Sequence, residues 1–239
     1  MFKNKYEYLY SLSLIFNNFF WFFGLELKRK QKHPYTWLQD MHIDSVLDIW
    51  ANSGQFLSKN LNLFPDAKFH SFEPLPYAYS LLKKNFAKHP NVKLYNIWLW
   101  SEKSDMVIHE SDYNPSSSFL EMTDIHKNAF PHTKKSHEVK VRVEKLDDLK
   151  ITSNNMLVKI DTQWYEMEVV LWWLTTIKKA KVCIIETSFY ELYKWQPLFA
   201  DIYNKMISLW FVYAWAYDQL KDPLNGSILQ QDMIFIQWN

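Results

Sequence analysis

The segment VLDIWANSGQF, which runs from Val46 to Phe56, decides the fold of this 239-residue chain. It begins with the apolar composition of a buried strand, carries Asp48 near the end of that strand, and predicts a helix from Gln55. The turn between the two elements brings backbone N–H groups close to a ligand, and a helix start favours a carboxylate or a phosphate. A strand, an acid, a tight turn and a helix in this order predict the first half of a nucleotide-type cofactor site.

A second acid follows at the end of the next predicted strand. The motif Phe72-Glu73-Pro74 places Glu73 where a carboxylate can accept hydrogen bonds from ribose hydroxyls. Taken alone, an acid at a strand end is more often a helix cap or a surface residue. The two acids together, in this order and at this spacing, favour an adenosine cofactor.

Apolar β-branched runs alternate with helical patterns from Ser45 onward, as is typical of parallel βαβ units. The predicted strands are 46–49, 68–72, 92–99, 156–160 and 181–185, and the predicted helices are 55–62, 76–88, 165–179 and 197–208. Two further strand-like segments, 106–110 and 138–144, flank a polar loop that contains Ser116–Ser118 and form an insertion. The tail predicts an antiparallel hairpin at the sheet edge, 211–217 and 233–237, with a turn at 222–226. We therefore expect an α/β protein with helices on both faces of its sheet.

Six segments, taken in order, resemble the FkbM family of methyltransferases: VLDIWANSGQF, FHSFEP, VKLYNIWLW, VKIDTQWYEMEVV, IIETSFYELY and YDQLKDPLNGSILQQDMIF. The resemblance extends from about Trp37 to the C-terminus. It implies a class I, Rossmann-like methyltransferase domain with a mostly parallel seven-stranded sheet. It also implies S-adenosyl-L-methionine as the cofactor and O-methylation of a sugar, glycan or other small-molecule hydroxyl. The chain then divides into an N-terminal helical and aromatic extension, 1–36, and a methyltransferase domain, 37–239.

The same resemblance assigns the cofactor site. Around the methionine part it places Asp48, Trp50 (a position that is glycine in the family pattern), Asn52 and Gly54. Glu73 would bind the ribose, and the segment from Asn96 to Ser101 would border the adenine.

Asp161 is the candidate catalytic residue, because it ends the fourth core strand where open α/β sheets place their chemistry. It would orient or deprotonate the acceptor hydroxyl. The alternative interpretation is a carboxylate that caps the helix beginning near Tyr165. Glu166 and Glu186 face the same crevice and could bind substrate hydroxyls or a cation. The histidines show no ligand spacing, so we expect no zinc or other metal site.

The composition has one anomaly, 12 tryptophans against 3 glycines. An average chain of this length carries about 17 glycines, from a usage of about 7%. Tryptophan stands where the family pattern places glycine at residues 50, 100, 164, 195 and 210, and this extends to residues 98, 172, 173 and 215. A gene that reads UGA as glycine, translated with a table that reads UGA as tryptophan, would give this pattern. The alternative is a tryptophan-rich, inactive relative that binds without turnover.

Charge and cysteine content limit the partners. With 27 basic and 26 acidic side chains the formal net charge is +1, so no global field favours nucleic acid. The single cysteine, Cys183, is predicted to be buried, which suits a reducing, cytoplasmic compartment. The interrupted apolar stretch 8–27, followed by a basic segment, predicts a packed helix with possible weak peripheral membrane contact. A nicotinamide-dependent oxidoreductase is disfavoured by the inserted strands and the terminal hairpin.

Overall fold

The computed structural model describes residues 35–101, 105–111, 136–163, 165–193 and 195–237. Residues 38–239 form one compact unit, which contains every strand discussed below. The predicted extension, residues 1–36, lies almost wholly outside the described residues, so the helix and the membrane contact expected there stay predictions. Within the part of the chain that is described, no helix has both the length and the apolar character needed to cross a membrane.

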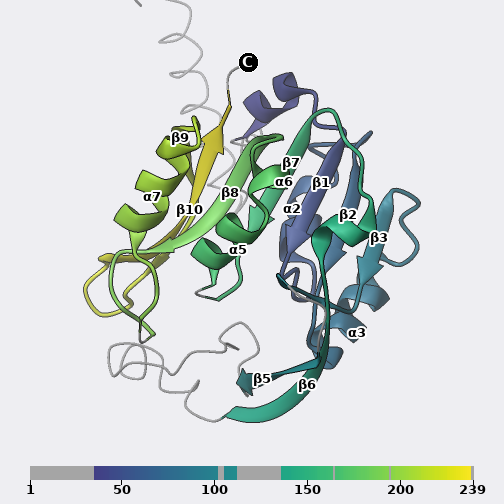
Figure 1. The fold of residues 1–239 in the computed structure, drawn as a ribbon, viewed down its shortest axis with the longest axis horizontal. Coiled ribbons are helices and arrows are strands. Elements are labelled where there is room, and N and C mark those ends of the chain that lie inside the picture. Colours follow the sequence, from purple (N-terminus) through teal and green to yellow (C-terminus); the bar gives the residue numbers. More distant parts are fainter. Residues whose placement is uncertain (1–34, 102–104, 112–135, 164, 194, 238–239) are drawn as a thin grey trace, which may run out of the picture. The chain divides into compact units, whose positions relative to one another are not determined.

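A seven-stranded sheet forms the centre of the unit, in the order β3-β2-β1-β7-β8-β10-β9 (Figure 1). Its strands are β1 (Ser45–Ile49), β2 (Lys68–Phe72), β3 (Val92–Tyr95), β7 (Met156–Ile160), β8 (Ala180–Ser188), β9 (Val212–Lys221) and β10 (Ile228–Ile236). β1, β2, β3, β7 and β8 pair in parallel, whereas β10 pairs antiparallel with both β8 and β9. The predicted fold, including the C-terminal antiparallel hairpin at the sheet edge, is thereby confirmed.

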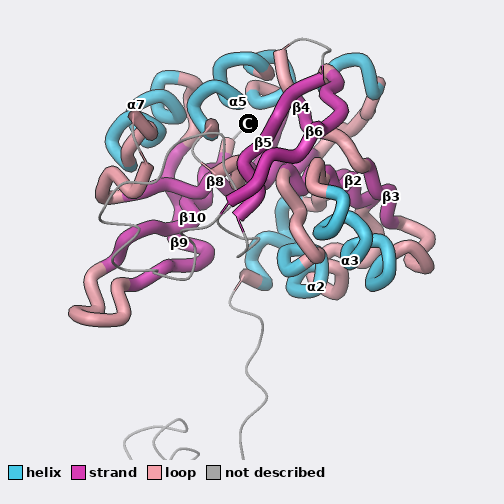
Figure 2. Tube along the Cα trace, turned by 90° about the horizontal axis from the view of Figure 1, so that it is seen from below, coloured by secondary structure: helices cyan, strands magenta, loops and turns pink. Residues whose placement is uncertain are grey.

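Helices cover both faces of this sheet (Figure 2). One face carries α2 (Gln55–Asn60) and α3 (Pro76–Phe86), and the other carries α5 (Glu166–Trp172), α6 (Leu174–Ile177) and α7 (Phe199–Ser208). The described residues also include two short 3₁₀ helices, η1 (Thr36–Met41) and η4 (Leu146–Leu149). Coverage on both sides explains why every residue of β1 and β7 is buried.

A second sheet of three strands holds the insertion, in the order β4-β6-β5. It consists of β4 (Trp98–Leu99), β5 (Asp105–Ser111) and β6 (Ser136–Glu144), with β5 and β6 antiparallel. The single strand expected over 92–99 is therefore wrong: it divides into β3 and β4, because Asn96 turns aside to bond the loop after β2. Ser116–Ser118, in the predicted polar loop, lie outside the described residues.

The helix expected over 165–179 is also divided. Trp173, with φ −110° and ψ 34°, leaves helical geometry and separates α5 from α6. Its side chain is 3% exposed and packs in the main core cluster. Cys183, in β8, is fully buried as predicted, and burial raises the pKa of its thiol well above the usual value.

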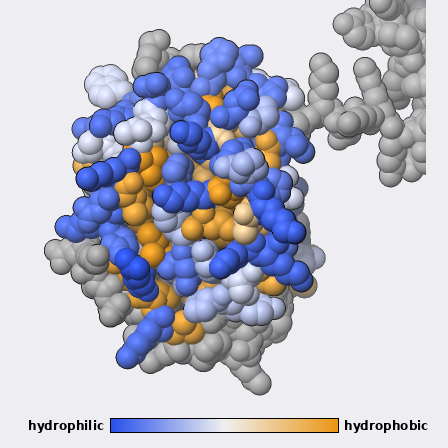
Figure 3. All heavy atoms as spheres, turned by 90° about the vertical axis from the view of Figure 1, so that its right-hand side faces the viewer, coloured by the Kyte–Doolittle hydropathy of each residue, from blue (hydrophilic) through white to orange (hydrophobic). Residues whose placement is uncertain are grey.

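The open edge of the sheet at β3 is exposed to solvent. Figure 3 shows this side of the molecule, where polar side chains surround smaller apolar areas. Lys93 projects from β3 with its ammonium nitrogen 5.1 Å from the centre of the Tyr95 ring. A charged side chain on an edge strand disfavours pairing with another chain.

Candidate active site

The turn after β1 is the first part of the site. Its backbone takes three positive φ values within five residues: 65° at Trp50, 50° at Asn52 and 96° at Gly54. The Ala51 N–H donates to the Phe72 carbonyl at 2.8 Å, so the turn is bonded to the end of the neighbouring strand β2. This tight course places the ends of β1 and β2 side by side.

Glu73 joins the two strand ends. Its carboxylate accepts hydrogen bonds from the backbone N–H of Asn52 (2.7 Å) and of Leu75 (2.9 Å). The Asn96 side-chain amide donates to the carbonyls of Glu73 (2.9 Å) and Pro74 (3.1 Å). The structure thus brings together the predicted residues Asn52, Glu73 and Asn96.

The Glu73 side chain is itself fully buried. Burial raises the pKa of its carboxyl to about 8, and the two backbone donors oppose that rise only in part. Each carboxylate oxygen already accepts one backbone N–H and keeps one further lone-pair direction for a ligand hydroxyl. Ribose binding at Glu73 remains a prediction.

Asp48 faces a buried lysine on the adjacent strand β7. Asp48 and Lys159 are paired in the strand register, and Lys159 Nζ lies 3.9 Å from Asp48 Oδ1 and 2.9 Å from Asp161 Oδ2. Burial raises the pKa of the Asp48 carboxyl to about 6 against the opposing charge of Lys159. Burial lowers the pKa of Lys159, but neighbouring aspartates, Asp161 foremost, outweigh burial and raise it overall. Lys159 therefore stays charged and holds the two strand-end acids together.

Three carboxylates gather at the ends of β7 and β8. Each of Asp161, Glu166 and Glu186 offers an oxygen within 4.8 Å of the others, and this is the group among the described residues with the geometry of a metal-ligand set. Gln163 donates to Asp161 at 2.8 Å and to Glu186 at 3.4 Å. The Thr162 backbone N–H donates to Glu166 at 2.8 Å. Asp161 is thus oriented by hydrogen bonds from its own loop, and no side chain caps the start of α5 within the described residues.

The electrostatics of this carboxylate group favour protonation of some members. Burial, and next the charge of Asp161, raises the pKa of Glu186 well above its usual value. The same two causes raise the pKa of Asp232, on β10, to about 7. A hydroxyl that enters here meets the Asp161 carboxylate oxygens and the Glu186 carboxyl, whose raised pKa favours its protonated form.

Trp50, at the position that the resemblance assigns to the methionine part of the cofactor, lies in a hydrophobic cluster. Its side chain is 3% exposed and packs with Leu75, Ala78, Trp98, Val141 and Val143. A row of neighbouring indoles continues from this cluster. The distances between ring centres are 4.8 Å from Trp50 to Trp98, 6.0 Å from Trp98 to Trp100 and 4.1 Å from Trp100 to Trp172. Asn52, Glu73 and Asn96 supply polar groups suited to an S-adenosylmethionine ligand, whereas the indole at 50 is buried in a hydrophobic cluster.

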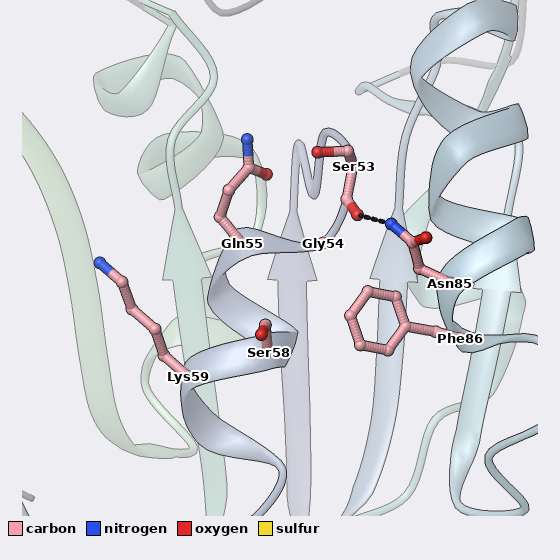
Figure 4. Close-up of a pocket in the computed structure, with 7 residues that line it drawn as sticks. All are labelled: Ser53, Gly54, Gln55, Ser58, Lys59, Asn85 and Phe86. Carbon is pink, nitrogen blue, oxygen red and sulfur yellow. Dashed lines mark hydrogen bonds between the residues drawn. The ribbon is translucent and has the colours of Figure 1, made fainter.

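A separate surface pocket of about 460 Å³ lies beside the start of α2 (Figure 4). Its lining comes from α2, α3 and the turn before α2: Ser53, Gly54, Gln55, Ser58, Lys59, Asn85 and Phe86. The Asn85 side chain donates to the Ser53 carbonyl at 3.2 Å, which ties α3 to this turn. Gly54 is the one predicted site residue in the pocket, and the acids described above do not line it.

Sequence reasoning missed three residues of the site, namely Lys159, Gln163 and Asp232. Lys159 had a readable signal, because a lysine inside a strand of buried residues needs a charged partner. Asp232 reaches the group only through the pairing of β10 with β8, where it lies opposite Glu186. No local pattern marks Gln163.

Comparison with known proteins supports the fold. No curated protein matches this sequence significantly. The crystal structure of an FkbM methyltransferase from Methylobacillus flagellatus KT is 10% identical, with a TM-score of 0.50 over 81% of this chain and 43% of that one. Magnesium protoporphyrin IX methyltransferase from Synechocystis PCC 6803, solved with bound SAM, is also 10% identical, with a TM-score of 0.47 over 86% and 76%. This chain spans less than half of the FkbM structure, and at 10% identity the likeness to that structure concerns the fold alone.

The family itself is identified by a sequence model. The model of the methyltransferase FkbM domain matches residues 48–213, which is more than half of the chain. The match begins at Asp48 and includes the strand-end acids Glu73, Asp161 and Glu186. With the seven-stranded class I sheet, it confirms the expected cofactor, S-adenosylmethionine. The chain belongs to the FkbM family of S-adenosylmethionine-dependent methyltransferase domains.

Proposed function

We propose that this domain transfers a methyl group to a hydroxyl of a sugar, a glycan or another small molecule. The observation that carries the proposal is the carboxylate group Asp161, Glu166 and Glu186 at the carboxyl ends of β7 and β8. Open α/β sheets bind their ligands at this edge, and carboxylates are suitable partners for hydroxyl groups. The near-neutral charge of the chain agrees with a small or uncharged acceptor rather than nucleic acid.

Asp161 is our candidate for the residue that orients or deprotonates the acceptor. Methyl transfer is an in-line displacement, so most of its acceleration can come from positioning of the acceptor oxygen. Lys159 and Gln163 each bond one oxygen of Asp161, which fixes the direction of the carboxylate. Glu186, with its raised pKa, would donate a hydrogen bond to the same acceptor.

The cofactor positions are proposed on the same basis. Asp48, Asn52, Gly54, Glu73 and Asn96 lie around the ends of β1 to β3, with position 50 between the first two. Asp48 is fully buried with Lys159 Nζ 3.9 Å from its Oδ1, and its carboxylate oxygens have further lone pairs that could accept a hydrogen bond from a ligand.

The test of this function is turnover in the Trp50→Gly protein, with methyl-labelled S-adenosylmethionine and a panel of sugars and small alcohols. In that background Asp161→Asn should lower kcat by roughly 10²-fold or more if a general base is lost. The affinity for S-adenosylhomocysteine, measured by calorimetry, should stay nearly unchanged. Asp66→Asn, at an exposed loop residue, is the matched control. Normal turnover in the Asp161→Asn protein would remove Asp161 from the reaction.

A second candidate function follows from the burial of Trp50. If tryptophan is native at this position, the filled turn favours a domain that keeps the methyltransferase fold and binds a partner without turnover. Mass spectrometry of the protein from its natural source separates the two candidates, because glycine at position 50 favours the enzyme and tryptophan at position 50 favours the binding protein.

A further inference from the structure

Three tryptophans have a backbone conformation that belongs to glycine. Their φ angles are 65° at Trp50, 65° at Trp195 and 68° at Trp210. The left-handed region brings Cβ too close to the next carbonyl oxygen, and glycine alone enters it without this clash. For a bulky residue such a φ is a true outlier, unlike the φ of 50° at Asn52, whose residue type tolerates it.

Side-chain packing does not explain the positive φ angle at two of these three tryptophans. Trp195 is 91% exposed and Trp210 is 86% exposed, so no buried contact of the indole compensates for the strained backbone. An exposed indole contributes little buried apolar surface, so it does not offset the energetic cost of the strained backbone at that residue.

The end of α7 specifies the residue type at 210 most sharply. The Trp210 N–H donates to the Ile207 carbonyl at 3.0 Å, and the Phe211 N–H donates to the Met206 carbonyl at 3.1 Å. These two bonds form a Schellman motif in which residue 210 is the left-handed C′ position. Phe211 and Met206 are both buried in the core cluster, which supplies the hydrophobic contact of the motif. Glycine is the usual residue at C′.

We infer that positions 50, 195 and 210 are glycine in the native protein, and that glycine at 50 opens the turn for the methionine end of the cofactor. The second part rests on the proposed function, and the first does not. The composition agrees, because 3 glycines and 12 tryptophans are the reverse of ordinary usage. Removal of the indole at 50 takes away a buried ring whose centre lies 4.8 Å from that of Trp98.

Trp215 provides the matched control. Its side chain is also exposed, at 66%, but it lies within β9, opposite Ile234 of β10, and its φ is not positive. Glycine in a strand interior is less stable than alanine. The preference between glycine and alanine should therefore reverse between position 215 and positions 195 and 210.

The first experiment compares thermal unfolding midpoints of Trp→Gly and Trp→Ala variants at each position, so that loss of the indole is common to both. At 195 and at 210 the glycine variant should melt higher than the alanine variant by about 2 °C or more. At 215 the alanine variant should melt higher. An equal or inverted order at 195 and 210 would overturn the inference. Mass spectrometry of the protein from its natural source is an independent test. Peptides with tryptophan at residues 195 and 210 would overturn the inference.

The second experiment measures S-adenosylhomocysteine binding by calorimetry to the unaltered chain and to Trp50→Gly. We expect binding by the variant and none by the unaltered chain. If the order of midpoints holds and Trp50→Gly folds without binding, the proposed function fails while the assignment of glycine stands. If the unaltered chain binds equally well, the role of position 50 is refuted.

Discussion

At the scale of single residues, Lys159 organises the charged part of the site. It is 8% exposed at the side chain and contacts acids at the ends of two neighbouring strands, Asp48 on β1 and Asp161 after β7. Each of these charged groups loses its hydration when it is buried, and the attraction between the ammonium and the carboxylates offsets part of that desolvation cost. Asp161 is held in place for an acceptor by the same contact.

Replacement of Lys159 by methionine should destabilise the fold strongly, by about 3–5 kcal/mol, because buried carboxylates lose their cation. The matched control is Lys59→Met. Lys59 pairs with Asp218 at 2.7 Å, but the two side chains are 53% and 56% exposed. Loss of that exposed pair should change the free energy of unfolding by at most about 1 kcal/mol. Urea denaturation of both variants measures the difference, and similar losses would show that Lys159 does not serve this role.

At the scale of elements, the packing of α3 against the start of α2 fixes the turn after β1. Gly54 is the N-cap of α2 and has φ 96°, and a Cβ at this residue would lie 2.2 Å from a ring atom of Phe86 on α3. Asn85, next to Phe86, bonds the same turn. The turn is therefore shaped both by its own backbone and by a helix that follows the next strand.

Gly54→Ala should destabilise the protein by about 2–5 kcal/mol, since the left-handed strain and the contact with Phe86 add together. Gly226→Ala is the control that measures the left-handed backbone strain without a steric clash. Gly226 has φ 76°, but a Cβ there meets nothing within 4 Å, so its loss should be about 1–2 kcal/mol. Denaturant titration of the two variants is the measurement. A loss at Gly54 no larger than at Gly226 would show that Phe86 moves aside freely.

At the scale of the whole molecule, buried acids make stability depend on pH. Burial raises the pKa of Glu73 from 4.5 to about 8 and that of Asp232 from 3.8 to about 7. The folded state thus binds more protons than the unfolded state above pH 4.5, so these groups stabilise most at low pH and lose that effect as pH rises to about 8. His70 acts in the opposite sense, because burial lowers its pKa from 6.5 to about 4.

Above pH 6.5 the effect of His70 is complete, so the acids decide the trend. The free energy of unfolding should fall between about pH 6.5 and 8.5, with a slope of up to about 1.4 kcal/mol per pH unit for each titrating carboxyl. Glu73→Gln should flatten the slope, because an amide does not titrate, and Asp66→Asn should leave it unchanged. Urea denaturation across this range tests the prediction, and a rising stability would contradict it.

The sequence by itself determined the order of the elements and the strand-end acids. The patterns around 46–56, 68–74 and 156–161 predicted β1, β2 and β7 to within a residue, because alternating strands and helices leave a strong periodic signal. The FkbM resemblance was also readable from these segments, and the family match confirms it. Asp48, Glu73 and Asp161 all follow from their position at strand ends.

Only the tertiary structure decided how those residues meet. The pairing of Lys159 with Asp48 depends on the register between β1 and β7, and Asp232 reaches Glu186 through β10, both of which are long-range choices. The break at Trp173 and the separate strand β4 arise from packing that overrides local propensity. The left-handed backbone at Trp50, Trp195 and Trp210 could be suspected from composition, but it is set by the turns that close the fold. Local patterns determine the order of strands and helices along the chain, whereas strand register and turn geometry depend on contacts between residues far apart in the chain.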